Sequence, residues 1–278
     1  MPEQAQKHAP LPTDAAALPA MGEAFEKGVE EVVRQLGLTG STAAAAAARY
    51  SYELHARLLT AWGAAINLTA IREPAAIAVR HVGDALSAVP ALVEHGATTR
   101  SLLDIGSGGG YPGLPLAAAL GPTRVDLVDS VGKKARFLEV AAAAVASVLQ
   151  PEDGVPPVIE AVGERAEDIA EDPERRETWE VVTARAVGPL SEVMELALPL
   201  ARIGGTVVAW KRDGDGTDLR AELRDAGHII RVAGGGRPAV VKVSGEAFSK
   251  HRLVLVDKER ASQSGYPRPP GARKRGRR

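Results

Sequence analysis

A glycine-rich turn follows one acidic residue and precedes another by about twenty positions. Asp104 lies in an apolar run just before the glycines of residues 106–110, and Asp129 ends a second apolar run. Glycine allows both a positive-φ turn and the close approach of a ligand to the backbone. Pro112 suits the first turn of a helix, whose free N–H groups would face that ligand. The spacing predicts a site for a polar, nucleotide-type cofactor.

Two cofactor classes compete for this turn. Gly108, Gly110 and Gly113 match the G-x-G-x-x-G dinucleotide fingerprint, which is weak evidence by itself. Asp104, two residues before Gly106, suits a cationic ligand better than a pyrophosphate. An aspartate followed by alternate glycines resembles the first motif of class I S-adenosylmethionine-dependent methyltransferases, whose cofactor carries a sulfonium and no phosphate. We favour S-adenosylmethionine and keep a dinucleotide and a purely structural turn as alternatives.

The second acidic residue has a separate predicted role. Asp129, at the end of its strand, would accept hydrogen bonds from the ribose hydroxyls of the cofactor. Asp126 lies inside the same strand, so we do not expect it to reach the crevice beyond the strand ends.

Alternating strands and helices must position these residues. Apolar runs and their periodicity predict strands at 101–105, 124–128, 157–161, 179–184, 204–210, 228–233 and 251–257. Helices are predicted at 113–120, 131–149, 189–201 and 216–226. This alternation over residues 96–260 predicts an α/β fold with a mostly parallel seven-stranded sheet and helices on both faces. We expect the last two strands, separated by glycine and proline, to form an antiparallel hairpin.

A helical extension is predicted before the sheet, over residues 20–95. Its helices cover 21–36 and 42–62, and a third follows Pro74. His81 and Asp84 lie three positions apart on the third helix, so we expect them to contact each other as a buried structural pair. Residues 1–19 are rich in alanine and proline, and we expect them to be disordered.

Charge is distributed unevenly along the chain. The net charge is −1, but residues 261–278 carry +6 and residues 1–260 carry −7. Glycine, proline and arginine dominate this tail, which predicts a disordered arm. The arm could contact RNA phosphates or serve only as a solubilising end. The cations concerned are Arg273, Lys274, Arg275, Arg277 and Arg278.

Composition excludes several classes of site. The chain has no cysteine, which rules out disulfides, cysteine-based zinc sites, iron–sulfur clusters and attack by a thiolate on a pyrimidine. We expect no metal. The first residues lack the regions of a signal peptide, and no run approaches 18 apolar residues. We therefore expect a cytoplasmic protein that does not interact with a membrane.

Several ordered segments together resemble one family. They occupy residues 62–74, 80–84, 103–108 with 112–113, 129–138, 164–167 and 184–186. The family is that of the bacterial 16S ribosomal RNA (guanine-N7)-methyltransferases, formerly called glucose-inhibited division protein B. The resemblance spans residues 45–260 and implies a Rossmann-like class I methyltransferase fold. The family often has proline and leucine at Gly109 and Tyr111, a departure that affects cofactor packing more than the reaction.

This resemblance implies methyl transfer from S-adenosylmethionine to N7 of one guanine in the decoding region (530 loop) of 16S ribosomal RNA. N7 carries a lone pair and no proton, so the attack needs no general base and depends on alignment. The partner would be the RNA or the small ribosomal subunit. The alternatives are a methyltransferase of a protein or small molecule, a non-catalytic ribosome-binding factor and a nicotinamide-dependent oxidoreductase.

The resemblance also implies a set of site residues. Arg185 could hydrogen-bond guanine O6 or stack on the base, although it could instead pair with a neighbouring carboxylate. Lys133 and Arg165 complete the catalytic set and could hold RNA phosphates, whereas Lys134 is as consistent with a solvated helix face. Glu167 would border the adenine, as the family resemblance implies, with an ordinary helix N-terminal acid as the alternative. The cofactor-binding set is Asp104, Gly106, Gly108, Tyr111, Asp129, Ala166, Glu167 and Arg185.

Overall fold

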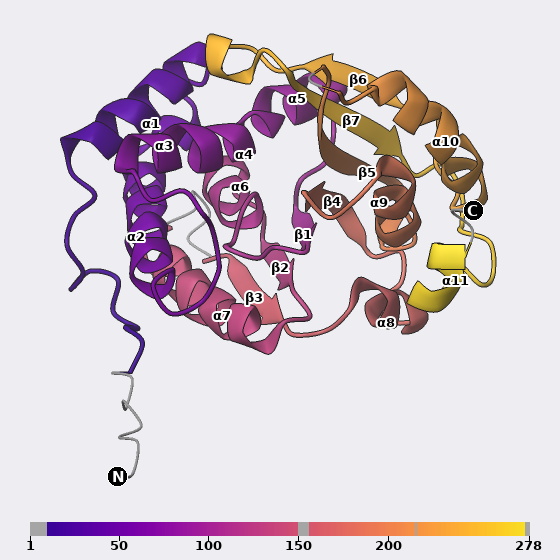
Figure 1. Cartoon of the computed structure of the whole chain (residues 1–278), viewed down its shortest axis with the longest axis horizontal. Helices are drawn as coiled ribbons and strands as arrows, with labels where there is room; N and C mark the ends of the chain where they lie inside the picture. Colours follow the sequence, from indigo (N-terminus) through magenta and orange to yellow (C-terminus); the bar gives the residue numbers. More distant parts are fainter. Residues whose placement is uncertain (1–9, 150–155, 215, 276–278) are drawn as a thin grey trace.

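A seven-stranded sheet forms the centre of the molecule. The computed structural model describes residues 10–149, 156–214 and 216–275 (Figure 1). The strand order is β3-β2-β1-β4-β5-β7-β6. The first five strands in this order are parallel, and β7 and β6 are antiparallel to their neighbours. The strands are β1 (Ser101–Ile105), β2 (Arg124–Val128), β3 (Val158–Val162), β4 (Trp179–Arg185), β5 (Ala201–Arg212), β6 (Ala239–Lys242) and β7 (His251–Asp257).

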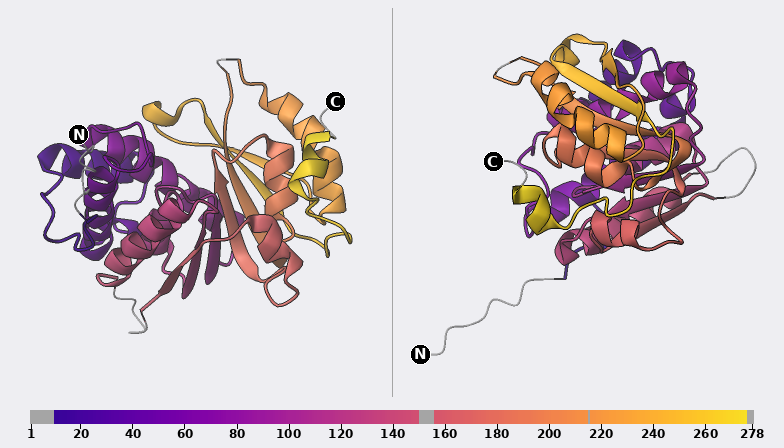
Figure 2. Two further views of the ribbon diagram at one scale, coloured as in Figure 1. Left: turned by 60° about the horizontal axis from the view of Figure 1, so that its bottom comes forward. Right: turned by 90° about the vertical axis from the view of Figure 1, so that its right-hand side faces the viewer.

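Helices cover both faces of the sheet, as predicted (Figure 2). One face packs against α5 (Ala88–His95), α6 (Gly113–Leu120) and α7 (Gly132–Ala146), and the other against α8 (Ala166–Glu171), α9 (Leu190–Ala197) and α10 (Leu219–Val232). Successive strand residues point to opposite faces, so Leu102 belongs to the first core and Leu103 to the second. Burial on both faces explains why the central strands are almost continuously apolar.

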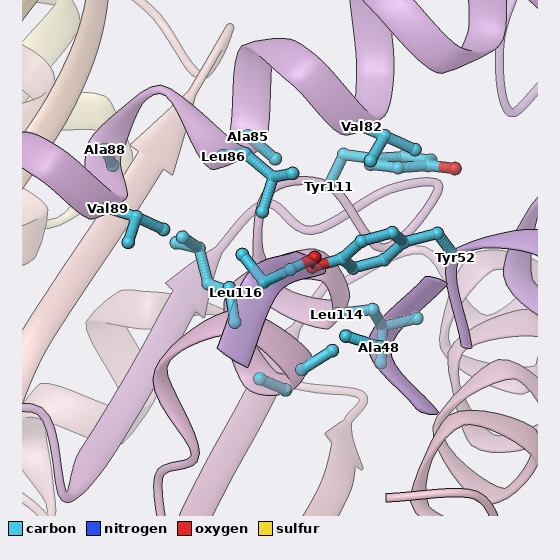
Figure 3. Close-up of a cluster of buried hydrophobic side chains, with 14 of the residues drawn as sticks. Ala48, Tyr52, Val82, Ala85, Leu86, Ala88, Val89, Tyr111, Leu114 and Leu116 are labelled. Carbon is cyan, nitrogen blue, oxygen red and sulfur yellow. Dashed lines mark hydrogen bonds between the residues drawn. The ribbon is translucent and has the colours of Figure 1, made fainter. Parts of the chain in front are cut away.

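The N-terminal extension shares the first of these cores. It contains α1 (Glu23–Gln35), the 3₁₀ turn η1 (Thr42–Ala44), α2 (Ala46–Trp62), α3 (Pro74–Ile77), the π-helical segment η2 (Ala78–Gly83) and α4 (Asp84–Leu86). Figure 3 shows Tyr52 of α2 and Leu86 of α4 beside Leu114 and Leu116 of α6. The extension is therefore joined to the sheet by a common apolar core.

One helical stretch in the described part of the chain, Pro74–His95, is long and apolar enough to cross a membrane. Most of its apolar side chains are enclosed by protein: Ile77, Val82 and Leu86 are at most 1% exposed, although Val93 near its end is 70% exposed. Gly83 lies so close to α1 that an added Cβ would be 2.7 Å from Val32. The stretch is a core helix of this fold.

The prediction of a strand at 228–233 is wrong. These residues form the last turns of α10 and its C-cap. Ala226, Ile229, Ile230 and Ala233 are buried in one core cluster, a spacing that one helical face against α9 satisfies. The seventh strand is instead β6, a short edge strand that the sequence reasoning missed. It pairs with β7, so the antiparallel hairpin at the end of the sheet is confirmed with a different partner.

The expectation of disorder at the two ends is wrong for their described parts. Trp62 donates a hydrogen bond from Nε1 to the carbonyl of Pro12 at 2.7 Å, and Ala15 is buried. At the other end, Arg268 pairs with Glu195, a carboxylate only 2% exposed, and a short helix follows, α11 (Pro270–Arg275). Residues 1–9 and 276–278 lie outside the described residues, as do the side chains of Lys274 and Arg275.

Candidate active site

The glycine turn has the predicted conformation at the carboxyl end of β1. Gly106, Gly108 and Gly110 have φ angles of 67°, 55° and 81°. The Ser107 N–H donates to the carbonyl of Val128 at 2.9 Å, which fastens the turn to the end of β2. The chain order reverses between β1 and β4, and ligands of open α/β sheets bind at such a switch point. Gly106 is exposed and Gly108 half-buried, so a ligand can reach their backbone.

Asp104 supports this turn from below. Its side chain is fully buried, accepting from the Gly113 N–H at 3.1 Å and from the Thr183 hydroxyl at 2.8 Å. Burial raises the pKa of Asp104 to about 6. The strand points this side chain toward α6 and β4, and the direct contact with a cationic cofactor stays a prediction. Asp104 ties β1 to both elements.

Asp129 lies where it was predicted, at the end of β2 against the turn. One carboxylate oxygen accepts from the Gly108 N–H at 3.0 Å and the other from the Val131 N–H at 2.9 Å. Each oxygen has a second lone pair. Lys134 is within 3.8 Å of the same carboxylate, so its ammonium belongs to this site more than to a solvated helix face. Asp126, in contrast, is buried inside the sheet, where its carboxylate accepts a hydrogen bond from the indole N–H of Trp179 at 2.6 Å.

Tyr111 was predicted to contact the cofactor, a contact that stays a prediction, and the structure shows which protein groups surround its ring. Its ring is stacked between His55 at 4.2 Å and His81 at 4.8 Å, and the residue is only 4% exposed. Both ring faces are therefore covered by protein. The side chain supports the turn from within the core shared with the N-terminal extension.

A pocket of about 660 Å³ opens between η2, α4 and the ends of β4, β5 and β7, and the residues that line it do not include the glycine turn. Cations outnumber acids in its wall. The charged or ionisable side chains that line it are Arg80, His81, Asp84, Arg185, Lys211, Arg212, Glu222, Lys250 and His251. Trp210 lines the same pocket, and its indole N–H donates to the carbonyl of Asp84 at 2.8 Å. The arrangement suits a planar, polar and electron-rich ligand.

Asp84 joins two of these side chains. Its Oδ2 accepts from the Arg185 guanidinium at 2.8 Å, and its Oδ1 bonds His251 Nδ1 at 2.8 Å. Burial by itself raises the pKa of Asp84, but the hydrogen bonds and charges of His251 and Arg185 outweigh it and leave the pKa below its usual value. The predicted contact between Asp84 and His81 is wrong, since His81 Nε2 bonds the Thr69 hydroxyl at 2.8 Å.

Residues 50–227 match the family of rRNA small subunit methyltransferase G. The chain belongs to this family. It is 39% identical over 224 residues to ribosomal RNA small subunit methyltransferase G of Roseiflexus sp. (strain RS-1), covering 81% of this chain and 87% of that one. The protein of the same name from Geobacillus kaustophilus (strain HTA426) is 35% identical over 226 residues, covering 79% and 87%.

Among solved structures, the T. Thermophilus 16S rRNA N2 G1207 methyltransferase in complex with AdoMet and guanosine aligns with a TM-score of 0.42 and 16% identity, covering 60% of this chain and 37% of that one.

Membership of the methyltransferase G family decides between the two cofactor classes. The chain is an S-adenosylmethionine-dependent rRNA methyltransferase with a class I fold, and the predicted family is confirmed. The turn fits that cofactor, because Gly106 is exposed and Gly108 half-buried, which leaves the backbone of both accessible. Asp129 presents free lone pairs beside it.

The structure does not bring the three predicted catalytic cations together. Arg185 lines the pocket at the end of β4. Lys133 and Arg165 are exposed and follow β2 and β3, which lie on the other side of β1. Ala166 is buried, and Glu167 is only 7% exposed because Arg273 of the C-terminal segment pairs with it. Lys133, Arg165, Ala166 and Glu167 therefore form a second region, at the carboxyl ends of β2 and β3.

The sequence reasoning missed His251. A signal for it was present: residues 251–257 were predicted as a strand at the end of the sheet, in an antiparallel hairpin. A strand that runs opposite to its parallel neighbours begins where they end, so its first residue lies at the edge that carries the site. Lys211 was missed as well; it donates to the carbonyl of Gly188 at 2.9 Å on the pocket wall.

Proposed function

We propose that this methyltransferase modifies N7 of one guanine in the 530 loop of 16S ribosomal RNA, on the RNA or the small subunit in the cytoplasm. The observation that carries the proposal is the position of Arg185. It lies at the end of β4, in a pocket large enough for a base, and β4 pairs with β1, the strand that leads into the glycine turn. Its guanidinium is also 5.7 Å from the Tyr111 ring, which restricts its orientation.

The chemistry of N7 agrees with the groups in this pocket. N7 has a lone pair and no proton, so the attack requires alignment and no general base. Asp84 is committed to hydrogen bonds with Arg185 and His251. Burial lowers the pKa of His81 to about 4, so its ring is neutral. Arg185 can donate to guanine O6, which holds the base by the atom next to N7 and leaves N7 free.

S-adenosylmethionine would supply the methyl group as a sulfonium when bound at the turn. We assign its ribose hydroxyls to Asp129 and its methionine part to the backbone of Gly106 and Gly108. Ala166 and Glu167 would border the adenine, with Arg273 neutralising Glu167. Arg185 would lie between the cofactor and the base.

RNA phosphates would contact the exposed cations at the same edge of the sheet. Lys133 is in the first turn of α7, and Arg165 precedes α8. The pocket that contains Arg185 is also lined by three exposed cations, Arg80, Arg212 and Lys250. Each phosphate neutralised by these side chains would make binding more dependent on salt.

The test is a chemical-cleavage map of 7-methylguanosine in 16S RNA from cells with and without this gene. Loss of one signal in the 530 loop is expected, and an unchanged map would contradict the proposal. With purified protein, Arg185→Ala should abolish methylation and keep the circular dichroism spectrum. Arg202→Ala is a matched control, because Arg202 pairs with Glu180 at the opposite end of the sheet. Near-normal turnover of Arg185→Ala would return Arg185 to a structural role.

A further inference from the structure

We propose that Arg185 and His251, both fixed by Asp84, form a donor and acceptor pair that recognises the O6 and N1–H edge of guanine. The inference rests on the proposed function and adds a specificity-determining residue, His251, and a positioning residue, Asp84. Both contacts to Asp84 are 2.8 Å long and use different carboxylate oxygens. One buried carboxylate therefore sets the separation and orientation of two pocket side chains.

The contact to Asp84 fixes the tautomer of His251. The ionised carboxylate can only accept, so Nδ1 carries a proton. Nε2 then has a lone pair. Its neighbour is the guanidinium of Arg212 at 3.4 Å, a group that can only donate. Nε2 is therefore the acceptor atom of this ring, and because it has a single lone pair, the N1–H of guanine would replace the long contact with Arg212.

The ring of His251 is held in place on a second side. Phe248 lies 5.6 Å from it, with the two ring planes tilted by 57°. His251 and Phe248 both line the pocket that contains Arg185. Because His251 is the first residue of β7, its backbone is also fixed by pairing with Arg212 of β5. The pocket thus presents a fixed acceptor beside a fixed donor.

This pair is complementary to guanine and not to adenine. Guanine offers an acceptor, O6, next to a donor, N1–H, whereas adenine offers a donor amino group next to the acceptor N1. A guanidinium can only donate and Nε2 of this tautomer can only accept. Adenine would place its amino group against the donors of Arg185 and its N1 against Nε2, so neither protein group would gain a partner from the base, which is how polar sites reject close analogues. N7 takes part in neither contact and stays available to the methyl donor.

Two replacements of His251 separate recognition from support. His251→Asn places an amide N–H near the position of Nδ1 and keeps the bond to Asp84, but it has no acceptor at the position of Nε2. His251→Gln can place its amide oxygen there and loses the donor to Asp84. We expect kcat/KM for RNA to fall about 10- to 100-fold in His251→Asn and less in His251→Gln. The reverse order, with Asn near normal, would overturn recognition by His251.

Base analogues at the target position supply a readout that a structural role would not change. Inosine keeps O6, N1–H and N7, whereas 2-aminopurine keeps N7 but lacks O6 and N1–H. The wild-type enzyme should methylate RNA with inosine about as well as RNA with guanosine, and should discriminate against 2-aminopurine about 100-fold or more. His251→Asn should lose much of this discrimination. Equal rates on 2-aminopurine and guanosine would overturn the inference.

Asp84→Asn tests the positioning residue, with Asp126→Asn as a matched buried carboxylate outside the pocket. Asp84→Asn should lower kcat on RNA while binding of S-adenosylhomocysteine, measured by calorimetry, stays within about twofold. Asp126→Asn should leave kcat unchanged, and equal kcat values in the two variants would contradict positioning by Asp84. Failure of the wild-type enzyme to methylate guanosine RNA would instead contradict the proposed function itself.

Discussion

His55 on α2 donates a hydrogen bond from Nε2 to the carbonyl of Gly109 at 2.7 Å. A carbonyl only accepts, so Nε2 carries the proton, and Nδ1 is buried without a hydrogen-bond partner. The contact is so close that a Cβ on Gly110 would lie 2.8 Å from the same Nε2. The helical extension therefore holds the glycine turn directly, and it does so through a neutral histidine.

This contact predicts a dependence of stability on pH. Burial lowers the pKa of His55 to about 3, below its ordinary value of 6.5. Below pH 6.5 the unfolded chain binds a proton that the folded chain does not, so stability falls as the pH falls. Relative to His55→Gln, the wild type should lose about 2 kcal/mol of unfolding free energy between pH 6.5 and 5, measured by urea denaturation. If the unfolding free energies of the two proteins changed in parallel with pH, a neutral, buried His55 would be contradicted.

Asp104 predicts a dependence of the opposite sign. Its pKa is raised to about 6 from an ordinary value of 3.8, so between these values the folded chain keeps a proton that the unfolded chain has lost. Stability therefore falls as the pH rises from about 4 to 6, by roughly 2 kcal/mol. Asp104→Asn cannot ionise, and its amide can donate to the Thr183 hydroxyl. The variant should gain that amount relative to the wild type over this window, and no relative gain would show that Asp104 is ionised throughout.

Asp129 should contribute directly to cofactor affinity. Asp129→Ala removes the acceptor that faces the turn and the bond to the Gly108 N–H. Calorimetry should show about 10- to 100-fold weaker binding of S-adenosylhomocysteine, equivalent to about 1.5 to 3 kcal/mol. Asp126→Asn should bind with unchanged affinity, because Asp126 lies inside the sheet. Unchanged affinity of Asp129→Ala would refute the ribose role.

The C-terminal segment should contribute to stability through Arg268. Arg268→Ala would leave the carboxylate of Glu195 buried without its cation, which should cost about 1 to 3 kcal/mol in urea denaturation. The segment should also become sensitive to trypsin, since its anchor is lost. Arg34→Ala, which removes an exposed pair with Glu31, should leave the urea midpoint unchanged. The same response from both variants would mean that the Arg268 pair contributes no more than a surface contact.

Local sequence determined much of this fold. The glycines that need positive φ, the proline before α6 and the alternation of apolar runs predicted the turn, the parallel sheet and its helices. Residues 228–233 show the limit of such reasoning. A short run of β-branched residues fits a strand or a helix equally well, and packing of Ile229 and Ile230 against a neighbouring helix decided the outcome.

The sequence by itself determined the family, the methyl donor and the position of the glycine turn, because each depends on residues close together in the chain. Only the tertiary structure decided what the side chains do. Spacing alone could not show that Asp104 points into the core, or that Asp84 meets Arg185 and His251 from 101 and 167 residues away. Such contacts depend on which strand ends meet at one edge of the sheet. Nor could composition show that the arginine-rich tail has buried carboxylates to bind.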